Sequence, residues 1–206
     1  MTRPCVQVLK SLYGLKQSGR QWYQKYADVL KREGFVTTDE VPTVFFKLSN
    51  NGPCITSVYV DDTNAMGCPK AVDSTVNILK QNFKMKDFGT VTGCIGIQID
   101  HLNQGTFIHQ TQMVDKILLC MGMVDAPMKQ TPLAVRNVRF DSDIYRSGVE
   151  DEEFYPYIES YRSMIGMLSY LANTTRPDIS FSVNLMARFS NKPTYRHFDG
   201  IRHICA

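Results

Sequence analysis

Two adjacent carboxylates, Asp61 and Asp62, are the side chains of this sequence best suited to chemistry. They follow the apolar-rich run 55–60 and precede the turn-prone stretch 63–67. If both flanks are β-strands, the acids lie at the tip of a hairpin, where the reversing backbone aims both at one point; on a straight strand they would point to opposite faces. Clustered carboxylates are hard oxygen ligands for Mg²⁺, and a metal site of that kind supports phosphoryl transfer. The alternative is an ordinary polar turn, because Asp is a common turn residue.

The segments around the two acids predict the frame that positions them. Apolar residues at helical spacing predict a helix over 20–33, which Gly34 ends. Strands are expected at 43–48 and 54–60 around an Asn-Gly turn, with a weaker third strand after the acids. A helix at 72–83 and a second hairpin at 95–110 follow. This order predicts an α+β fold, with an antiparallel sheet that carries its helices on one face.

The second half of the sequence is mainly helical in pattern. An apolar stripe over 114–121 is closed by Gly122, and such a stripe is typical of a core-facing helix. The stretch 125–159 contains three prolines and an acidic run, so it is interpreted as a linker. Helices are expected at 160–173 and 177–190, and a third helical pattern covers 201–206.

Composition indicates a globular protein inside the cell. The chain has 206 residues, of which 43% are hydrophobic and 21% charged, and this balance argues against disorder over its full length. A net charge of +3 is small for a nucleic-acid-binding protein, so any such contact has to come from a local basic cluster. The six cysteines are scattered singly, which favours reduced thiols over a zinc site or a disulfide framework. No apolar run is long enough to cross a membrane, and a soluble protein is expected.

Seven short motifs share an order and spacing with one known family. They are Leu15-Lys16-Gln17, Tyr59-Val60-Asp61-Asp62, Lys86-Asp87-Phe88-Gly89, Ile95-Gly96-Ile97, Thr131-Pro132-Leu133, Tyr161-Arg162-Ser163-Met164-Ile165-Gly166 and Thr175-Arg176-Pro177-Asp178-Ile179. On these motifs the sequence is similar to the reverse transcriptase of copia-type long-terminal-repeat retrotransposons from about residue 9 to residue 203. The resemblance implies an incomplete polymerase palm over 1–110, a thumb-like helix and linker over 111–159, and a helical connection region over 160–206 that ends before an RNase H domain.

The resemblance also implies roles for individual residues. Asp61 and Asp62 match the two catalytic, metal-binding aspartates of the palm hairpin, with Mg²⁺ or Mn²⁺ as the cofactor. Tyr59 is then expected beside the primer terminus and Gln17 near the incoming nucleotide or the template base. Lys16 and Arg20 are expected to approach phosphates, whereas without the resemblance a solvent-exposed helix start is the favoured interpretation of both.

This sequence departs from the family pattern at several places. Ser18-Gly19 stands where Ala-Pro is usual, and Thr63 to Met66 replaces an apolar strand. Gly93-Cys94 replaces an aromatic pair. A third catalytic aspartate is expected upstream of the Leu-Lys-Gln motif, but residues 1–9 contain no acid, and the four acids before the hairpin lie in a predicted helix or loop. These are Asp28, Glu33, Asp39 and Glu40.

Three hypotheses remain open from the sequence. The first is a fragment of an RNA-directed DNA polymerase, inactive in isolation because the upstream aspartate and the fingers are missing. Its parent would act on an RNA or DNA primer-template and deoxynucleotides, in a cytoplasmic retrotransposon particle or in the nucleus, together with the missing upstream and RNase H segments. The second is a non-catalytic nucleic-acid-binding remnant. The third is an inert truncated product.

Overall fold

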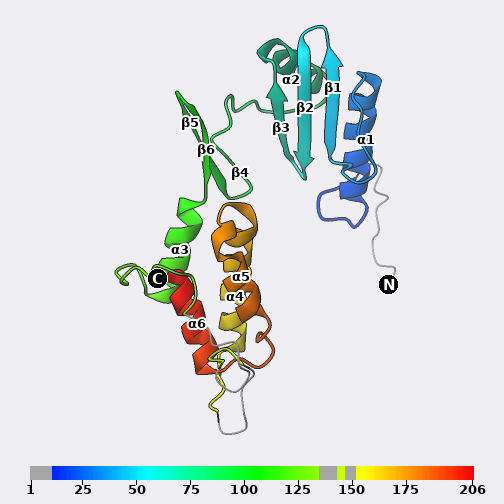
Figure 1. Cartoon of the computed structure of the whole chain (residues 1–206). Coiled ribbons are helices and arrows are strands. Elements are labelled where there is room, and N and C mark those ends of the chain that lie inside the picture. The colour runs from blue at the N-terminus through cyan, green and yellow to red at the C-terminus, as the bar shows by residue number, and fades with distance from the viewer. Residues whose placement is uncertain (1–10, 135–142, 147–151) are drawn as a thin grey trace, which may run out of the picture. The chain divides into compact units, whose positions relative to one another are not determined.

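The chain divides into two compact units, Met1–Val91 and Thr92–Ala206. The computed structural model describes residues 11–134, 143–146 and 152–206 (Figure 1). Each unit combines a three-stranded antiparallel sheet with α-helices, so the expected α+β class is confirmed. The functional division of the sequence into 1–110, 111–159 and 160–206 stays a prediction.

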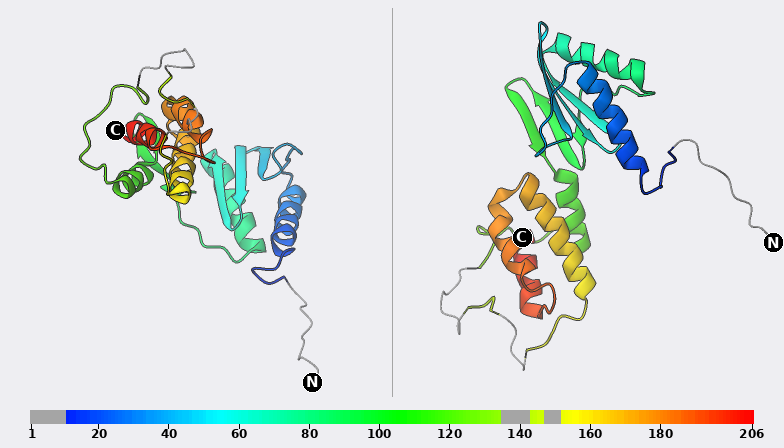
Figure 2. Two further views of the ribbon diagram at one scale, coloured as in Figure 1. Left: turned by 90° about the horizontal axis from the view of Figure 1, so that it is seen from below. Right: turned by 90° about the vertical axis from the view of Figure 1, so that its right-hand side faces the viewer.

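The first unit is a sheet with the strand order β1-β2-β3 and two helices on one face (Figure 2). Burial along β2 alternates, with Cys54, Thr56 and Val58 buried while Ile55 and Tyr59 are exposed. This period of two is the pattern of a sheet covered on one side only. The elements are α1 (Ser18–Arg32), β1 (Val44–Ser49), β2 (Gly52–Tyr59), β3 (Asp62–Gly67) and α2 (Pro69–Asn82).

An aromatic cluster fills the space between this sheet and its helices. The ring of Tyr26 on α1 lies 5.8 Å from that of Phe45 on β1 and 5.8 Å from that of Phe83, which follows α2. Tyr26 and Phe45 are fully buried. Large buried rings dominate the energetics of a small core, so this cluster fixes α1 against the sheet. Other buried members are Ala27, Val29, Leu30, Phe35, Cys54, Val58, Ala71 and Leu79.

The third strand forms in spite of its polar sequence. Six residue pairs join it to β2, from Tyr59↔Asp62 at the turn to Cys54↔Gly67 at the far end. Asn64 is a poor strand former, but it pairs with Ser57 on the face that the helices leave open, where a polar side chain is tolerated.

The second unit joins a small sheet of the order β4-β5-β6 to a group of helices. The expected second hairpin is confirmed, and the helix over 111–121 ends at Gly122 with φ +61°, the left-handed cap that the sequence predicted. The helix expected over 177–190 is instead a 3₁₀ turn followed by a shorter α-helix, and the last helix begins at Tyr195 rather than at 201. The elements are β4 (Gly93–Cys94), β5 (Ile97–Leu102), β6 (Gly105–His109), α3 (Thr111–Met121), α4 (Ile158–Thr174), η2 (Pro177–Ile179), α5 (Ser180–Ala187) and α6 (Tyr195–Cys205).

The stretch 125–159 is not a simple linker where the structure describes it. Leu133, Tyr145 and Tyr155 are buried in the same core as Tyr161 and Leu168 of α4. The proline and acidic residues of this stretch led to the prediction of a linker, although these three side chains belong to the core. Residues 135–142 and 147–151 of this stretch, which include Glu150 and Asp151 of the acidic run, lie outside the described residues.

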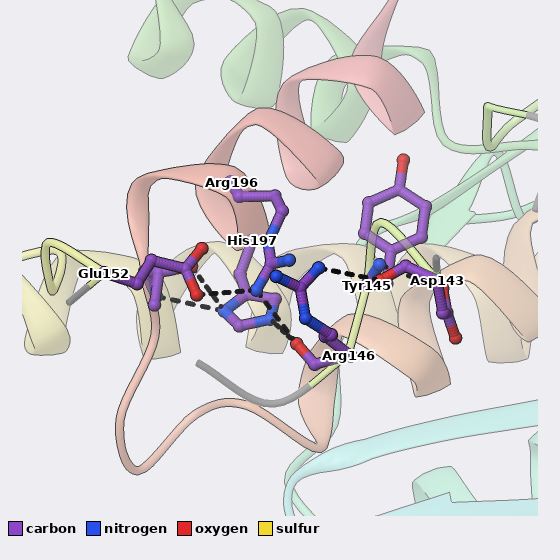
Figure 3. Close-up of polar contacts among 7 residues, drawn as sticks. Asp143, Tyr145, Arg146, Glu152, Arg196 and His197 are labelled. Carbon is purple, nitrogen blue, oxygen red and sulfur yellow. Dashed lines mark hydrogen bonds and ion pairs between the residues drawn. The ribbon is translucent and has the colours of Figure 1, made fainter. Parts of the chain in front are cut away.

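A polar cluster ties this stretch to the start of α6 (Figure 3). The Arg196 guanidinium donates to the Glu152 carboxylate at 2.7 Å and to the Arg146 carbonyl at 3.1 Å. The buried His197 accepts from the Thr194 backbone N–H at 3.0 Å through Nδ1, and its Nε2 lies 3.0 Å from the Arg146 carbonyl. These contacts require a neutral imidazole with its proton on Nε2. Burial lowers the pKa of His197, which favours this neutral form.

None of the described helices is long and apolar enough to cross a bilayer. The five cysteines that the structure describes, at positions 54, 68, 94, 120 and 205, are all free thiols.

Candidate metal-binding hairpin

Asp61 and Asp62 lie on a two-residue β-hairpin, as the sequence predicted. Tyr59 and Asp62 form the last strand pair, and Val60 and Asp61 make the turn between them. Val60 has φ +52°, while Asp61 is not among the residues with positive φ in the described chain. A positive φ at the first central residue only is the pattern of a type II′ turn, which suits the twist of a hairpin and usually has glycine at that position.

The turn presents its polar side chains toward solvent. Tyr59 alternates with the buried Val58, so its side chain, 58% exposed, projects from the face of the sheet that α1 and α2 leave open. Asp62 pairs with Tyr59 and therefore shares that open face. Asp61 stands at the tip, and both carboxylates are exposed. The predicted metal ligands and the predicted primer-side tyrosine are therefore brought together on one edge of the sheet.

Helix α1 supports the turn from the covered face. The indole Nε1 of Trp22 donates to the Val60 carbonyl at 2.8 Å. Its ring packs edge-on against Phe83, with centroids 5.1 Å apart, and lies 6.1 Å from the ring of Tyr26. Burial raises the pKa of Tyr26 to about 12, so this phenol stays neutral under the hairpin. The sequence indicated Trp22 only as one apolar position of an amphipathic helix; the unusual signal was that it is the single tryptophan of the chain.

The two carboxylates fit part of a Mg²⁺ or Mn²⁺ site. Mg²⁺ in proteins is commonly held by one or two carboxylates and completes its octahedron with waters and substrate phosphates. Asp61 and Asp62 would supply such a pair on a solvent-exposed turn. Within the described residues, no group of three or more His, Cys, Asp or Glu side chains is placed to hold a metal. An ion held by this pair would take its remaining oxygen ligands from water, substrate or other groups.

The residues expected at the nucleotide side lie at the start of α1. Gln17 is the N-cap of this helix and makes no side-chain capping bond. Lys16, Gln17 and Arg20 are exposed. Arg20 is two positions from Trp22, so the two side chains point to different sides of the helix, and the side of Trp22 faces the hairpin. The roles of Lys16, Gln17 and Arg20 in binding nucleotide or template stay predictions.

The other early acids are on the surface. Asp28 lies on α1, and Glu33 is its C-cap. Glu40 is engaged locally, because hydrogen bonds from its own backbone N–H and from Thr38 lower its pKa. Residues 1–10, in which the first nine positions contain no acid, lie outside the described residues.

Comparison with known proteins identifies the family. Residues 2–135 match the family described as "Reverse transcriptase (RNA-dependent DNA polymerase)". The retrovirus-related Pol polyprotein from transposon TNT 1-94 of Nicotiana tabacum is 31% identical over 199 residues, which cover 95% of this chain and 15% of the polyprotein. The putative transposon Ty5-1 protein of Saccharomyces cerevisiae is 30% identical over 195 residues, which cover 94% of this chain and 61% of that protein.

A third relative gives the same picture. The Pol polyprotein from transposon RE1 of Arabidopsis thaliana is 31% identical over 196 residues, which cover 95% of this chain and 13% of the polyprotein. No solved structure matches the chain. This chain spans less than two thirds of the length of each of these three relatives. It belongs to the reverse transcriptase (RNA-dependent DNA polymerase) family, in the branch of the copia-type retrotransposons.

Proposed function

We propose that this chain is the part of a retrotransposon RNA-directed DNA polymerase that carries the metal-binding hairpin of the palm. The observation that carries the proposal is the two-residue turn at Val60 and Asp61, which sets the exposed Asp61 carboxylate at its tip and the exposed Asp62 carboxylate beside Tyr59 on the open face of the sheet. Membership of the reverse transcriptase family supports it. In this assignment, the first unit is palm and the helices of the second unit are thumb and connection.

The side chains around the turn have distinct roles in the proposal. A divalent metal bound there, Mg²⁺ or Mn²⁺, supplies Lewis-acid stabilisation of phosphate charge. Asp61 and Asp62 hold it through carboxylate oxygens, and Tyr59 packs beside the primer end. Gln17 contacts the incoming deoxynucleotide or the template base, and Lys16 and Arg20 approach phosphates. The nucleic acid is an RNA or DNA primer-template, and the parent polyprotein acts in a cytoplasmic particle or in the nucleus.

We further propose that these 206 residues alone do not extend a primer. Metal affinity depends on the number and placement of oxygen ligands, and the described residues add no third carboxylate to the pair. Most of the catalytic effect in phosphoryl transfer comes from holding the reacting atoms in line, which needs the whole nucleotide pocket. The family's upstream aspartate and fingers must then be supplied by other segments of the polyprotein.

Two measurements on the purified chain test this proposal. Titration with Mn²⁺, followed by the electron paramagnetic resonance signal of the free ion, should show weak binding that Asp61→Ala with Asp62→Ala abolishes. A matched control is Asp28→Asn with Glu33→Gln, which removes the same charge from exposed positions away from the turn and should leave binding intact. Equal loss in both variants would show non-specific attraction and contradict the metal site.

The second measurement is primer extension on an RNA template. The proposal expects no metal-dependent extension above the background of the Asp61→Ala, Asp62→Ala variant. Extension above that background would refute the claim that the chain is catalytically incomplete. Binding of primer-template without Mn²⁺ binding would favour the nucleic-acid-binding remnant instead.

A further inference from the structure

The hairpin that carries Asp61 and Asp62 contains a backbone conformation that its sequence disfavours. Val60 has φ +52°, a region that β-branched residues rarely enter because their Cβ crowds the backbone. Glycine is the usual residue at this turn position. A valine persists there only where surrounding contacts over-determine the conformation. Some contact outside the turn must therefore hold it.

Trp22 makes such a contact. Its indole N–H donates to the Val60 carbonyl at 2.8 Å, and this carbonyl belongs to the peptide that joins Val60 to Asp61. That peptide is the central one of the turn, and its orientation distinguishes turn types and sets the direction in which Asp61 leaves the turn. The indole is itself held by Phe83 and Tyr26. Trp22, which is held by the core, thus binds the central peptide of the turn.

A second hairpin of the chain makes a similar contact. Ile95 and Gly96 form the two-residue turn between Cys94 and Ile97, with φ +50° and +72°; this turn is of type I′ rather than II′, but its first central residue is again β-branched with a positive φ. The hydroxyl of Tyr170 on α4 donates to the Ile95 carbonyl. Val60 and Ile95 are the two non-glycine residues with positive φ in the part of the chain that the structure describes. In both, an aromatic donor from a helix binds the carbonyl of the unfavourable residue.

We propose that Trp22 is a positioning residue of the candidate metal site: its indole N–H fixes the Val60–Asp61 peptide and thereby the direction of the Asp61 carboxylate. The effect on the turn stands on geometry alone, whereas the effect on metal binding rests on the proposed function. Trp22 acts through the backbone and contacts neither metal nor substrate. The sequence feature behind it is a tryptophan in the second turn of α1, four positions before the buried Tyr26.

A pair of matched variants tests the proposal. Trp22→Phe removes the indole N–H and keeps an aromatic ring against Phe83 and Tyr26. Tyr23→Phe, on the same helix, removes a hydrogen bond of equal length, from the Tyr23 hydroxyl to the Pro42 carbonyl at 2.8 Å, and leaves the hairpin untouched. The backbone of the turn is followed by NMR of the ¹⁵N-labelled chain, through the amide shifts of residues 59–62 and the HN–Hα couplings of Val60 and Asp61. The coupling of Val60 reports its φ, and the coupling of Asp61 responds to the orientation of the peptide between them.

The proposal expects a change that is confined to the hairpin. Trp22→Phe should move the coupling of Val60 or Asp61 and the shifts of residues 59–62, and should weaken Mn²⁺ binding about three- to tenfold, the effect of losing one hydrogen bond. Tyr23→Phe should change Mn²⁺ affinity less than about twofold. In a Val60→Gly background, where a positive φ carries no steric cost, the effect of Trp22→Phe should shrink to about twofold.

Three results would overturn it: unchanged couplings of both Val60 and Asp61 in Trp22→Phe, an equal change of the hairpin in Tyr23→Phe, or an undiminished effect in the Val60→Gly background. If Trp22→Phe does not fold, the same readings are taken with Trp22 replaced by 3-benzothienylalanine, which has the indole shape without the N–H. If the wild-type chain does not bind Mn²⁺ but the coupling still responds to loss of the donor, the proposed metal site fails and the positioning role stands.

Discussion

Replacing Gly67 by alanine tests whether β3 is paired as the structure has it. Gly67 closes the pairing of β3 with β2 at φ +152°, and a Cβ added there would lie 2.2 Å from the Pro53 carbonyl oxygen. Conformations of this kind cost a non-glycine residue about 1–3 kcal/mol. Forcing an extra methyl group against fixed backbone adds about 1–3 kcal/mol. Gly67→Ala should therefore lower the free energy of unfolding of the first unit by about 2–6 kcal/mol, a large part of the stability of a small domain.

Urea unfolding followed by tryptophan fluorescence measures this change. Trp22 is the single tryptophan and packs in the core of the first unit, so its emission reports on that unit. With a slope of about 1–3 kcal/mol per molar urea, the midpoint should fall by at least about 0.7 M. The control is Gly19→Ala in α1, where an added Cβ meets nothing within 4 Å. This substitution should raise the free energy of unfolding by about 0.5–1 kcal/mol. An unchanged midpoint in Gly67→Ala would refute the register of β3.

Two further predictions concern the second unit. His197 accepts the Thr194 N–H as a neutral imidazole, and its pKa lies below the ordinary value of 6.5. The unfolded chain therefore binds the proton more readily than the folded one. The free energy of unfolding should fall as the pH drops below about 6.5. His197→Gln keeps an acceptor that reaches the helix cap and should flatten this pH dependence in thermal melts, whereas an equal slope in both proteins would contradict the assignment. Tyr161→Phe removes a buried hydrogen bond to the Met186 carbonyl, which still accepts from the Phe189 N–H. The free energy of unfolding, measured by circular dichroism melts, should therefore fall by only about 1 kcal/mol. A fall of more than about 3 kcal/mol would contradict this expectation.

The sequence predicted the first unit well because its signals are local. The helix over Ser18–Arg32 follows from apolar spacing, and the β1–β2 hairpin was predicted from its Asn-Gly signal, although Gly52 pairs with Ser49 and the two turn residues are Asn50 and Asn51. The hairpin at Asp61 and Asp62 was predicted from its flanks. The sequence signal for β3 was weak. Asn64 and Met66 lie on the outward face of this strand, and whether such residues are accommodated in a strand depends on their cross-strand partners.

The remaining features depend on tertiary contacts that no local pattern encodes. The hydrogen bond from Trp22 to Val60 joins residues 38 positions apart, and periodicity alone marks this tryptophan as one more apolar residue. Tyr145 and Tyr155 lie in a stretch rich in proline and acid, so composition indicated a linker although both side chains are core residues. The late start of α5, at Ser180, reflects a 3₁₀ turn that begins at Pro177, which periodicity does not distinguish from an α-helix.

Locating the residues at which a divalent ion binds tests the proposed metal site most directly. Mn²⁺ is paramagnetic, so a bound ion broadens the NMR signals of nearby amides in the ¹⁵N-labelled chain. If the hairpin binds the ion, residues 59–63 lose intensity first, and the loss disappears in Asp61→Ala with Asp62→Ala but persists in Asp28→Asn with Glu33→Gln. Broadening centred elsewhere, or broadening at the turn that survives the removal of Asp61 and Asp62, would contradict the claim that this hairpin is a metal-binding site.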